Sequence, residues 1–219
     1  MKTMKKTTKT AKIKTINKHI SLVLAVIMLL AVFAPLVSSF ADSADIVIKN
    51  EKDYLNLVKK CKTDTWSKGK TVTLANDIDL SKTDFSPIPT FGGHFDGKGY
   101  TISGIKINKK GSATGLFRYI QSGATVENLN VSGTVTPDGT QKNIGGIVGS
   151  LSGTLKNCTF SGNIKAKTNV GGIAGYVTET GVIDSCTFSG SVIATSYTGG
   201  IAGQNFGTIS NCENKGSIN

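Results

Sequence analysis

A five-residue glycine motif recurs three times in the second half of the chain, and it constrains the fold more than any other feature. The copies GGIVG, GGIAG and GGIAG begin at Gly145, Gly171 and Gly199. The cysteines Cys158, Cys186 and Cys212 follow them, one after each copy. The spacing from each cysteine to the next motif is constant, whereas the spacing from motif to cysteine is longer by two in the middle copy. The extra length is therefore expected within residues 176–181, in a corner that absorbs it without shifting a strand.

Alignment of the copies gives columns of apolar residues, which two earlier segments, 115–135 and 100–107, join. Polar residues stand between the apolar positions, so the pattern alternates with the period of a β-strand. The predicted columns are Ile102, Val126, Leu155, Ile183, Ile209; Ile105, Leu129, Cys158, Cys186, Cys212; Ile107, Val131, Phe160, Phe188, Asn214; and Val135, Ile164, Val192, Ile218. Glu127, Lys156 and Asp184 form a predicted outward column of alternating charge.

Each repeat is long enough for only two or three short strands, and it cannot bury its apolar face alone. Stacked copies solve this problem, because like positions then lie above one another at about 4.8 Å per rung and the strands pair in parallel. Right-handed crossover is the default for such connections. The sequence thus predicts an all-β fold, a right-handed parallel β-helix over residues 81–219, with copies at 145–170, 171–198 and 199–219.

The segment upstream of the repeats has a helical pattern instead. Apolar residues recur at helical spacing between residues 50 and 62, and Asn50 is placed to cap a helix with Asp53 three residues on. We predict a short amphipathic helix that covers the open end of the first coil, within a segment of cap helix and first strands at residues 46–80.

The N-terminal segment, 1–41, has the layout of a secretory signal. Seven lysines precede an apolar stretch at positions 22–34, and Pro35 follows it. That stretch is shorter than the about 20 residues of a membrane-spanning helix, and positions 39–41 offer small side chains at the cleavage site. We predict a signal peptide over residues 1–41, cleaved after Ala41 or alternatively after Ala44. This segment is the only part of the chain that is expected to contact a membrane. An uncleaved N-terminal anchor is the alternative.

Charge argues against a nucleic-acid partner. The formal net charge is +11, but seven of the basic residues lie in the predicted signal peptide, which leaves 18 basic and 14 acidic residues. A scattered balance of +4 offers no stripe of cations for phosphates.

The repeats resemble the GLUG motifs of bacterial surface proteins, on the strength of GGIVGSLSGTLKNCTFSGNI and its two later copies. KTVTLANDIDL (residues 70–80) and FGGHFDGKGYTISGI (residues 91–105) are similar to the segment that precedes such repeats in pectate-lyase-like β-helix proteins. The resemblance covers residues 46–219. It implies a right-handed β-helix at a bacterial cell surface, including the non-catalytic parts of some surface peptidases, and it implies no activity.

The repeat cysteines are expected to be small buried apolar residues, because their column holds leucine and isoleucine in earlier rungs. CxxC and CxxH spacings are absent from the sequence, so we predict no metal site and no cofactor. The motif GGIxG has apolar residues where calcium repeats carry aspartate. Its glycines are expected to allow a sharp corner at φ values that other residues avoid.

Acidic side chains are the other candidates for chemistry. Two pairs of carboxylates are candidate catalytic groups, Asp77 with Asp79 and Asp84 with Asp96. The expected role of Asp77 and Asp79 is instead to accept turn and ladder hydrogen bonds. Arg118, at a position of glycine in later copies, is expected to be a surface substitution. We therefore predict no catalytic residue.

The predicted function is a secreted or cell-surface structural and adhesive repeat domain with a surface polysaccharide or a protein as its partner. Tyr119, Tyr176 and Tyr197 are expected to be scattered surface aromatics, and stacking on sugar rings is the alternative role. One alternative is a carbohydrate-active β-helix enzyme that uses Asp77, Asp79 and Asp96, and another is the N-terminal part of a larger surface peptidase. The last coil is predicted to have an open edge, so we expect either that the natural chain continues with more repeats or a cap, or that this chain self-associates through its last coil.

Overall fold

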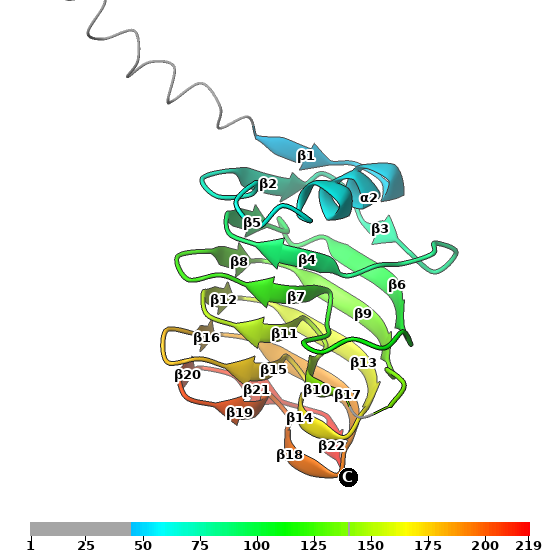
Figure 1. Ribbon diagram of the computed structural model, residues 1–219, viewed down its shortest axis with the longest axis vertical. Helices are drawn as coiled ribbons and strands as arrows, with labels where there is room; N and C mark the ends of the chain where they lie inside the picture. Colours follow the sequence, from blue (N-terminus) through cyan, green and yellow to red (C-terminus); the bar gives the residue numbers. More distant parts are fainter. Residues whose placement is uncertain (1–44, 140) are drawn as a thin grey trace, which may run out of the picture. The chain divides into compact units, whose positions relative to one another are not determined.

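The computed structural model describes residues 45–139 and 141–219. These residues form a parallel β-solenoid of about 6 turns with one short helix near its N-terminal end (Figure 1), which confirms the predicted fold class. The predicted signal peptide and its cleavage sites lie outside the described residues.

The coils build four parallel sheets, which we number 1 to 4, and among the described residues only the last three coils contribute strands to sheet 3. Sheet 1 contains β1 (Ile46–Ile48), β2 (Thr71–Leu74), β5 (His94–Asp96), β8 (Thr125–Glu127), β12 (Thr154–Lys156), β16 (Val182–Asp184) and β20 (Thr208–Ser210). Sheet 2 contains β3 (Ile78–Asp79), β6 (Thr101–Ile107), β9 (Asn130–Val135), β13 (Thr159–Lys165) and β17 (Thr187–Ile193), and both β21 (Glu213–Asn214) and β22 (Ser217–Ile218) pair with β17. Sheet 3 contains β10 (Lys142–Gly145), β14 (Thr168–Gly171) and β18 (Ser196–Gly199). Sheet 4 contains β4 (Ile88–Phe91), β7 (Phe117–Ile120), β11 (Val148–Leu151), β15 (Ala174–Val177) and β19 (Ala202–Asn205).

The strand register confirms the later members of the predicted columns. Leu155 lies between Val126 and Ile183, and Phe160 lies between Val131 and Phe188. The columns that end at Ile209, Asn214 and Ile218 are likewise paired as predicted. All of these side chains are buried above the last coil, so the columns form one continuous core.

The first members of three columns were predicted wrongly, because the segment 100–107 belongs to sheet 2 and not to sheets 1 and 2 together. Ile102 pairs with Val131, and Ile107 pairs with Val135. The residue that pairs with Val126 on the preceding coil in sheet 1 is Phe95. A register shift between Ile102 and Ile105 places Ile105 beside Gly133, outside the cysteine column. An irregularity of this kind leaves no trace in the periodicity.

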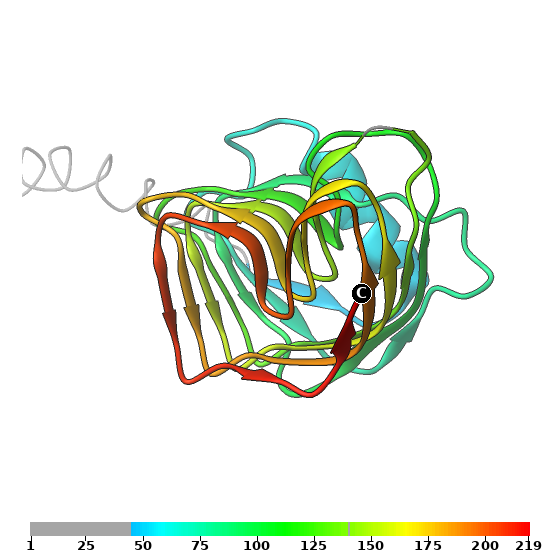
Figure 2. The same ribbon diagram turned by 90° about the horizontal axis from the view of Figure 1, so that it is seen from below.

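The glycine motifs form a corner that folds into the interior of each coil, between sheets 3 and 4 (Figure 2). At the second glycine of the motif a Cβ would lie 2.2 Å from the Phe160 ring at Gly146, and 2.3 Å from the Phe188 ring at Gly172. At the third glycine, Gly175, it would lie 2.2 Å from backbone atoms of β10. The motif glycines do not have positive φ, so the predicted reason for them was wrong. Glycine is required because a Cβ has no room.

Asparagine dominates a second corner, between sheets 1 and 2. Asn128, Asn157 and Asn211 have φ of 52°, 50° and 53°, and Ser185 has φ of 55°. Asparagine enters this left-handed region more readily than most residues. The stacked corners project side-chain amides onto the outer surface beside sheet 1.

The predicted helix is α2 (Glu51–Lys60), and its cap is the one expected. The Asn50 side-chain oxygen accepts a hydrogen bond of 3.1 Å from the backbone N–H of Asp53. Tyr54 is fully buried, stacks on the Phe85 ring at 6.0 Å and donates its hydroxyl hydrogen bond to the Ser86 carbonyl. The helix lies at the first coil, in contact with β1 and β4, so it covers that end of the core (Figure 1).

The outward charge column allows a test of the register. Lys156 pairs with Glu127 on one side and with Asp184 on the other, as predicted. We expect Lys156→Glu to lower the melting temperature more than Lys156→Gln, because it places three carboxylates in line. Each cross-strand charge pair contributes about 0.2–1 kcal/mol. Thermal unfolding of the two variants measures the difference, and equal melting temperatures would contradict it.

Candidate functional site

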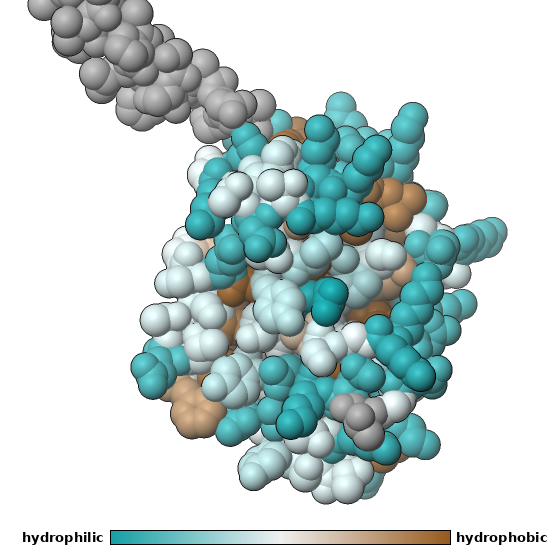
Figure 3. Space-filling view, in the orientation of Figure 1, coloured by the Kyte–Doolittle hydropathy of each residue, from teal (hydrophilic) through white to brown (hydrophobic). Residues whose placement is uncertain are grey.

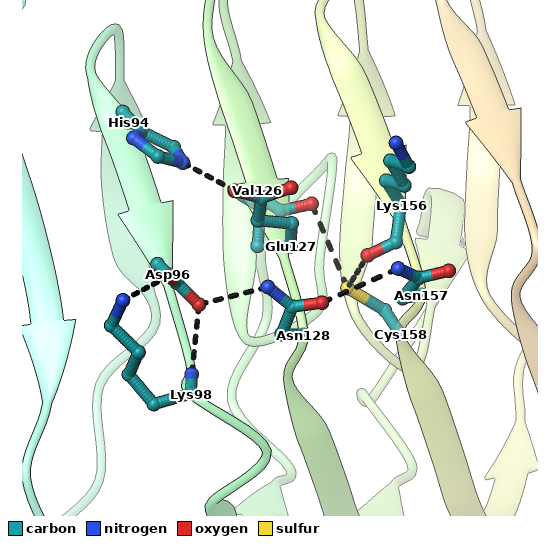
Figure 4. Close-up of polar contacts among 9 residues, drawn as sticks. All are labelled: His94, Asp96, Lys98, Val126, Glu127, Asn128, Lys156, Asn157 and Cys158. Carbon is teal, nitrogen blue, oxygen red and sulfur yellow. Dashed lines mark hydrogen bonds and ion pairs between the residues drawn. The ribbon is translucent and has the colours of Figure 1, made fainter.

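The outer face of sheet 1 carries a ladder of polar side chains that runs from coil to coil (Figure 4). Nε2 of His94 lies 2.8 Å from Oε1 of Glu127 on the next coil. The Asp96 carboxylate accepts hydrogen bonds from the Lys98 backbone N–H at 2.9 Å and from the Asn128 side chain at 3.0 Å, and it forms an ion pair of 2.8 Å with the Lys98 amine. The Asn157 side chain continues the ladder by donating to Asn128 at 3.3 Å.

The ladder holds Asp96 in its charged form. Partial burial raises the pKa of Asp96, but the hydrogen bonds from Lys98 and Asn128 and the charge of Lys98 outweigh it and lower the pKa to about 2. At pH values above 3.8, the ordinary pKa of an aspartate, the ionised Asp96 thus stabilises the folded chain. That contribution disappears as the pH falls towards 2. A carboxyl with so low a pKa stays ionised near neutral pH and is a poor general acid or base there.

The remaining acidic candidates have separate structural roles. Asp77 accepts a hydrogen bond of 2.7 Å from the Thr101 backbone N–H of the next coil, and Asp79 accepts one of 2.9 Å from Ser81. The hydrogen bond from the Ser81 backbone lowers the pKa of Asp79. Asp84 forms an exposed ion pair with Lys109. These contacts confirm the predicted turn and ladder hydrogen bonds of Asp77 and Asp79.

Arg118 is partly buried and binds backbone carbonyls of the loop before β7. The Arg118 guanidinium donates to the carbonyls of Ser112 and Ala113 and lies 5.7 Å from the Tyr119 ring, so it fastens the loop before β7.

Within residues 45–139 and 141–219, no three His, Cys, Asp or Glu side chains gather as metal ligands would. No helix in the described part of the chain is long and apolar enough to cross a membrane.

The repeat cysteines are free thiols in a column below the asparagine corner. Cys158 and Cys186 are buried, and Cys212, on the last coil, is partly exposed. Each thiol donates to the carbonyl two residues before it, at 3.2 Å for Cys158, 3.4 Å for Cys186 and 3.1 Å for Cys212. A hydrogen bond with Cys158, together with burial, raises the pKa of Cys186. Cys61, the C-cap residue of α2, is also buried, and burial raises its pKa to about 12.

We expect these thiols to react with a water-soluble alkylating reagent in a fixed order. Cys212 should be labelled first, and Cys61, Cys158 and Cys186 only when the chain opens, because the thiolate is the reactive form and burial disfavours it. Mass spectrometry of peptides after timed labelling measures the order. Rapid labelling of Cys158 or Cys186 in the native protein would contradict the buried column.

A surface hollow of about 400 Å³ lies at the corner between sheets 4 and 1 of the middle GLUG copy. Tyr176 of β15 and Phe206 after β19 contact each other with ring centroids 5.6 Å apart. The other lining residues are Thr178, Glu179 and Thr180, in the loop that holds the two extra residues. The Thr180 hydroxyl donates a hydrogen bond of 2.8 Å to the Ser152 carbonyl and so fixes the loop.

The three tyrosines singled out in the sequence do not form one surface. Tyr119 and Tyr176 share an outward column of sheet 4, with Ser150 between them, and Tyr197 lies on β18 of sheet 3. The residues that meet Tyr176 instead are Phe206 and Glu179. The two-residue insertion was the available sequence signal, but it located a loop and did not identify its aromatic neighbour.

Comparisons with known proteins agree with this architecture. The GLUG motif matches residues 140–165, 167–193 and 194–219, each beginning a few residues before the predicted copy. Halomucin of Haloquadratum walsbyi is 30% identical over 148 residues, which make up 60% of this chain and 2% of halomucin. The crystal structure of a candidate immunoglobulin A1 protease from Bacteroides ovatus matches with a TM-score of 0.63 at 23% identity, over 80% of this chain and 58% of that one. At this identity the structural match shows the fold alone.

The chain spans a small fraction of halomucin and little more than half of the Bacteroides chain. The three motif matches cover the last three coils, in which the inward glycine corner, the cysteine column and the asparagine corner repeat in register. This chain therefore carries three GLUG motif repeats on a parallel β-solenoid.

Proposed function

We propose that the chain is a secreted or cell-surface structural and adhesive repeat domain that presents its outer faces to a polysaccharide or a protein partner and catalyses no reaction. The observation that carries the proposal is the polar ladder of sheet 1, in which Asp96 and Asn128 hold one another in place between coils. Side chains so engaged stabilise the stack and are not free to transfer protons. The GLUG motifs and the match to halomucin support an extracellular location.

A carbohydrate-active enzyme that uses Asp77, Asp79 and Asp96 is the competing proposal. It receives less support, since Asp77, just before β3, and Asp79, the last residue of β3, accept backbone hydrogen bonds, and Asp96, the last residue of β5 in sheet 1, is ion-paired. The second alternative, that this is the N-terminal part of a larger surface peptidase, has no support beyond a fold likeness to the Bacteroides chain, which shows the fold alone.

Localisation and binding assays test the proposal together. Fractionation of the producing cells should recover the chain in the medium or at the cell surface. The full chain should adhere to immobilised polysaccharides or extracellular proteins, and it should leave acidic polysaccharides undegraded with and without calcium. Retention in the cytoplasm, or release of oligosaccharides that is abolished by Asp96→Asn, would overturn it.

The last coil is the proposed surface for self-association. Ile209 and Ile218 are 36% and 39% exposed, whereas Ile183 and Val192 above them are fully buried. The strands β19 and β20 each stand at an edge of their sheets, and exposed strand edges pair with other chains.

We expect the full chain to sediment as a concentration-dependent mixture of monomer and dimer in analytical ultracentrifugation. The double variant Ile209→Lys/Ile218→Lys should shift it to monomer, because buried lysines at the contact lack partners. Val47→Lys, at an exposed apolar position on β1, is the matched control and should leave the monomer–dimer equilibrium unchanged. A wild-type chain that is monomeric at all concentrations would contradict this prediction.

A further inference from the structure

The hollow beside the middle GLUG copy differs from the corresponding corners of the neighbouring coils in two ways. The corner that follows sheet 4 is a two-residue turn at Ser152–Gly153 and at Phe206–Gly207, but it has four residues at 178–181. Loop insertions in stacked repeats gather on one face and often build a binding site. The insertion here adds Glu179 and Thr180, and both side chains are exposed.

The second difference is an aromatic ring at a polar position. The backbone N–H of Ser152, Thr178 and Phe206 each donates to the last carbonyl of the sheet 4 strand one coil earlier, so the three residues occupy one column. Phe206 is the apolar member, and it is 53% exposed. In the space-filling view an apolar patch lies over the β19–β20 turn and is surrounded by polar surface (Figure 3).

The two aromatic rings line one side of the hollow with apolar surface, and the 178–180 loop lines the other side with polar groups. The Tyr176 and Phe206 rings are tilted by 47° to each other, so together they present a bent apolar platform. Glu179 lies beside it and makes no hydrogen bond or ion pair with a described residue. Thr178 and Thr180 are held against Ser152, which fixes the loop before any ligand arrives.

An apolar platform with an unpaired acceptor beside it suits a sugar ring. The C–H face of a pyranose packs on aromatic carbons, while its hydroxyls donate to a carboxylate and exchange hydrogen bonds with threonine hydroxyls. The volume of about 400 Å³ lies in the range of small-ligand sites, which is about 300–1,000 Å³. A uronic acid would place its carboxylate near Glu179, and like charges at short range repel.

We propose that Tyr176, Phe206 and Glu179 form a binding site for one neutral sugar ring of a glycan. This inference deepens the proposed adhesive function and rests on it, since it names the ligand class for one outer corner. Phe206 and Tyr176 form the stacking platform, and Glu179 accepts hydrogen bonds from ring hydroxyls.

The test is nuclear magnetic resonance of the isotopically labelled full chain, titrated separately with neutral trisaccharides of glucose, mannose, galactose and N-acetylglucosamine, and with trigalacturonic acid. We expect at least one neutral trisaccharide to shift the resonances of residues 176–180 and 206 in a saturable manner, and trigalacturonic acid to leave them unchanged. Phe206→Ala and Glu179→Gln should each weaken that binding on the order of tenfold. Tyr119→Ala is the matched control, because Tyr119 is an exposed tyrosine in the same column as Tyr176 and lies outside the hollow.

Three results would overturn the site: no shift with any neutral trisaccharide, shifts that Phe206→Ala leaves intact, or stronger binding of trigalacturonic acid. Adhesion of the full chain is measured in parallel. If adhesion persists while no sugar shifts these resonances, the sugar site is wrong and the adhesive function stands. If the chain shows neither adhesion nor a resonance shift, the adhesive function and the sugar site are both wrong.

Discussion

Replacement of Gly175 by alanine is expected to destabilise the solenoid strongly. The new Cβ would lie 2.2 Å from the carbonyl carbon of Asn143 and 2.2 Å from the backbone nitrogen of Ile144. Those atoms belong to β10, which is paired with β14, so they cannot move aside as a flexible side chain would. We expect the free energy of unfolding to fall by about 3 kcal/mol, which is at the upper end of the cost of overpacking a core. This loss corresponds to a fall in melting temperature of roughly 10 °C.

Gly111→Ala is the matched control for this prediction. The nearest atom to a Cβ at Gly111 is 3.9 Å away, and its φ is not positive, so the change should stay within about 0.5 kcal/mol. Circular dichroism during thermal and urea unfolding measures both variants. Equal stability of Gly175→Ala and the wild-type chain would show that the corner is not closely packed.

A double variant separates crowding from backbone strain at the same corner. A Cβ at Gly146 would meet ring carbons of Phe160 and no backbone atom among its three nearest neighbours. If crowding is the cause, Phe160→Leu should recover part of the stability that Gly146→Ala loses, so that the two changes are not additive. Strict additivity would favour a backbone requirement.

Replacement of Phe117 by alanine is expected to have the largest effect of a single core substitution. Phe117 is fully buried, and its ring lies 5.6 Å from those of both Phe91 and Phe95. Truncation of a buried phenylalanine typically costs about 3–5 kcal/mol, because the lost burial adds to a cavity that the surroundings fill only in part. The parallel ladders on both sides of β7 fix the spacing of the coils and hinder collapse.

Phe206→Ala is the control for Phe117→Ala, since it removes the same side chain from a site that is 53% exposed. Its destabilisation should be a small fraction of that of Phe117→Ala. Urea unfolding followed by the far-ultraviolet circular dichroism of the strands gives both values. A similar loss of stability for the two variants would show that Phe117 is not closely packed against Phe91 and Phe95.

The sequence by itself determined the features that repeat. Columns such as Val126, Leu155 and Ile183 could be aligned because a solenoid places like residues above one another, so the repeat period in the sequence is the stacking period in space. The Asn50 cap was equally predictable, because a helix start depends on residues within one turn of each other. The turn role of Asp79 followed from the same local rule, because its partner Ser81 is two residues away, whereas the ladder hydrogen bond of Asp77 follows from stacking on Thr101 of the next coil.

Only the tertiary structure decided the features that depend on contacts across the coil or on a break in the repeat. Gly146 must be glycine because the corner folds inward onto Phe160, from another side of the same coil, and sequence spacing does not record that approach. Ile105 left its predicted column because a shift in register has no periodic signature. Phe206 and Glu179 line one hollow with Tyr176 because an insertion in one coil lies against the turn of the next, and only stacking in three dimensions brings those residues to one place.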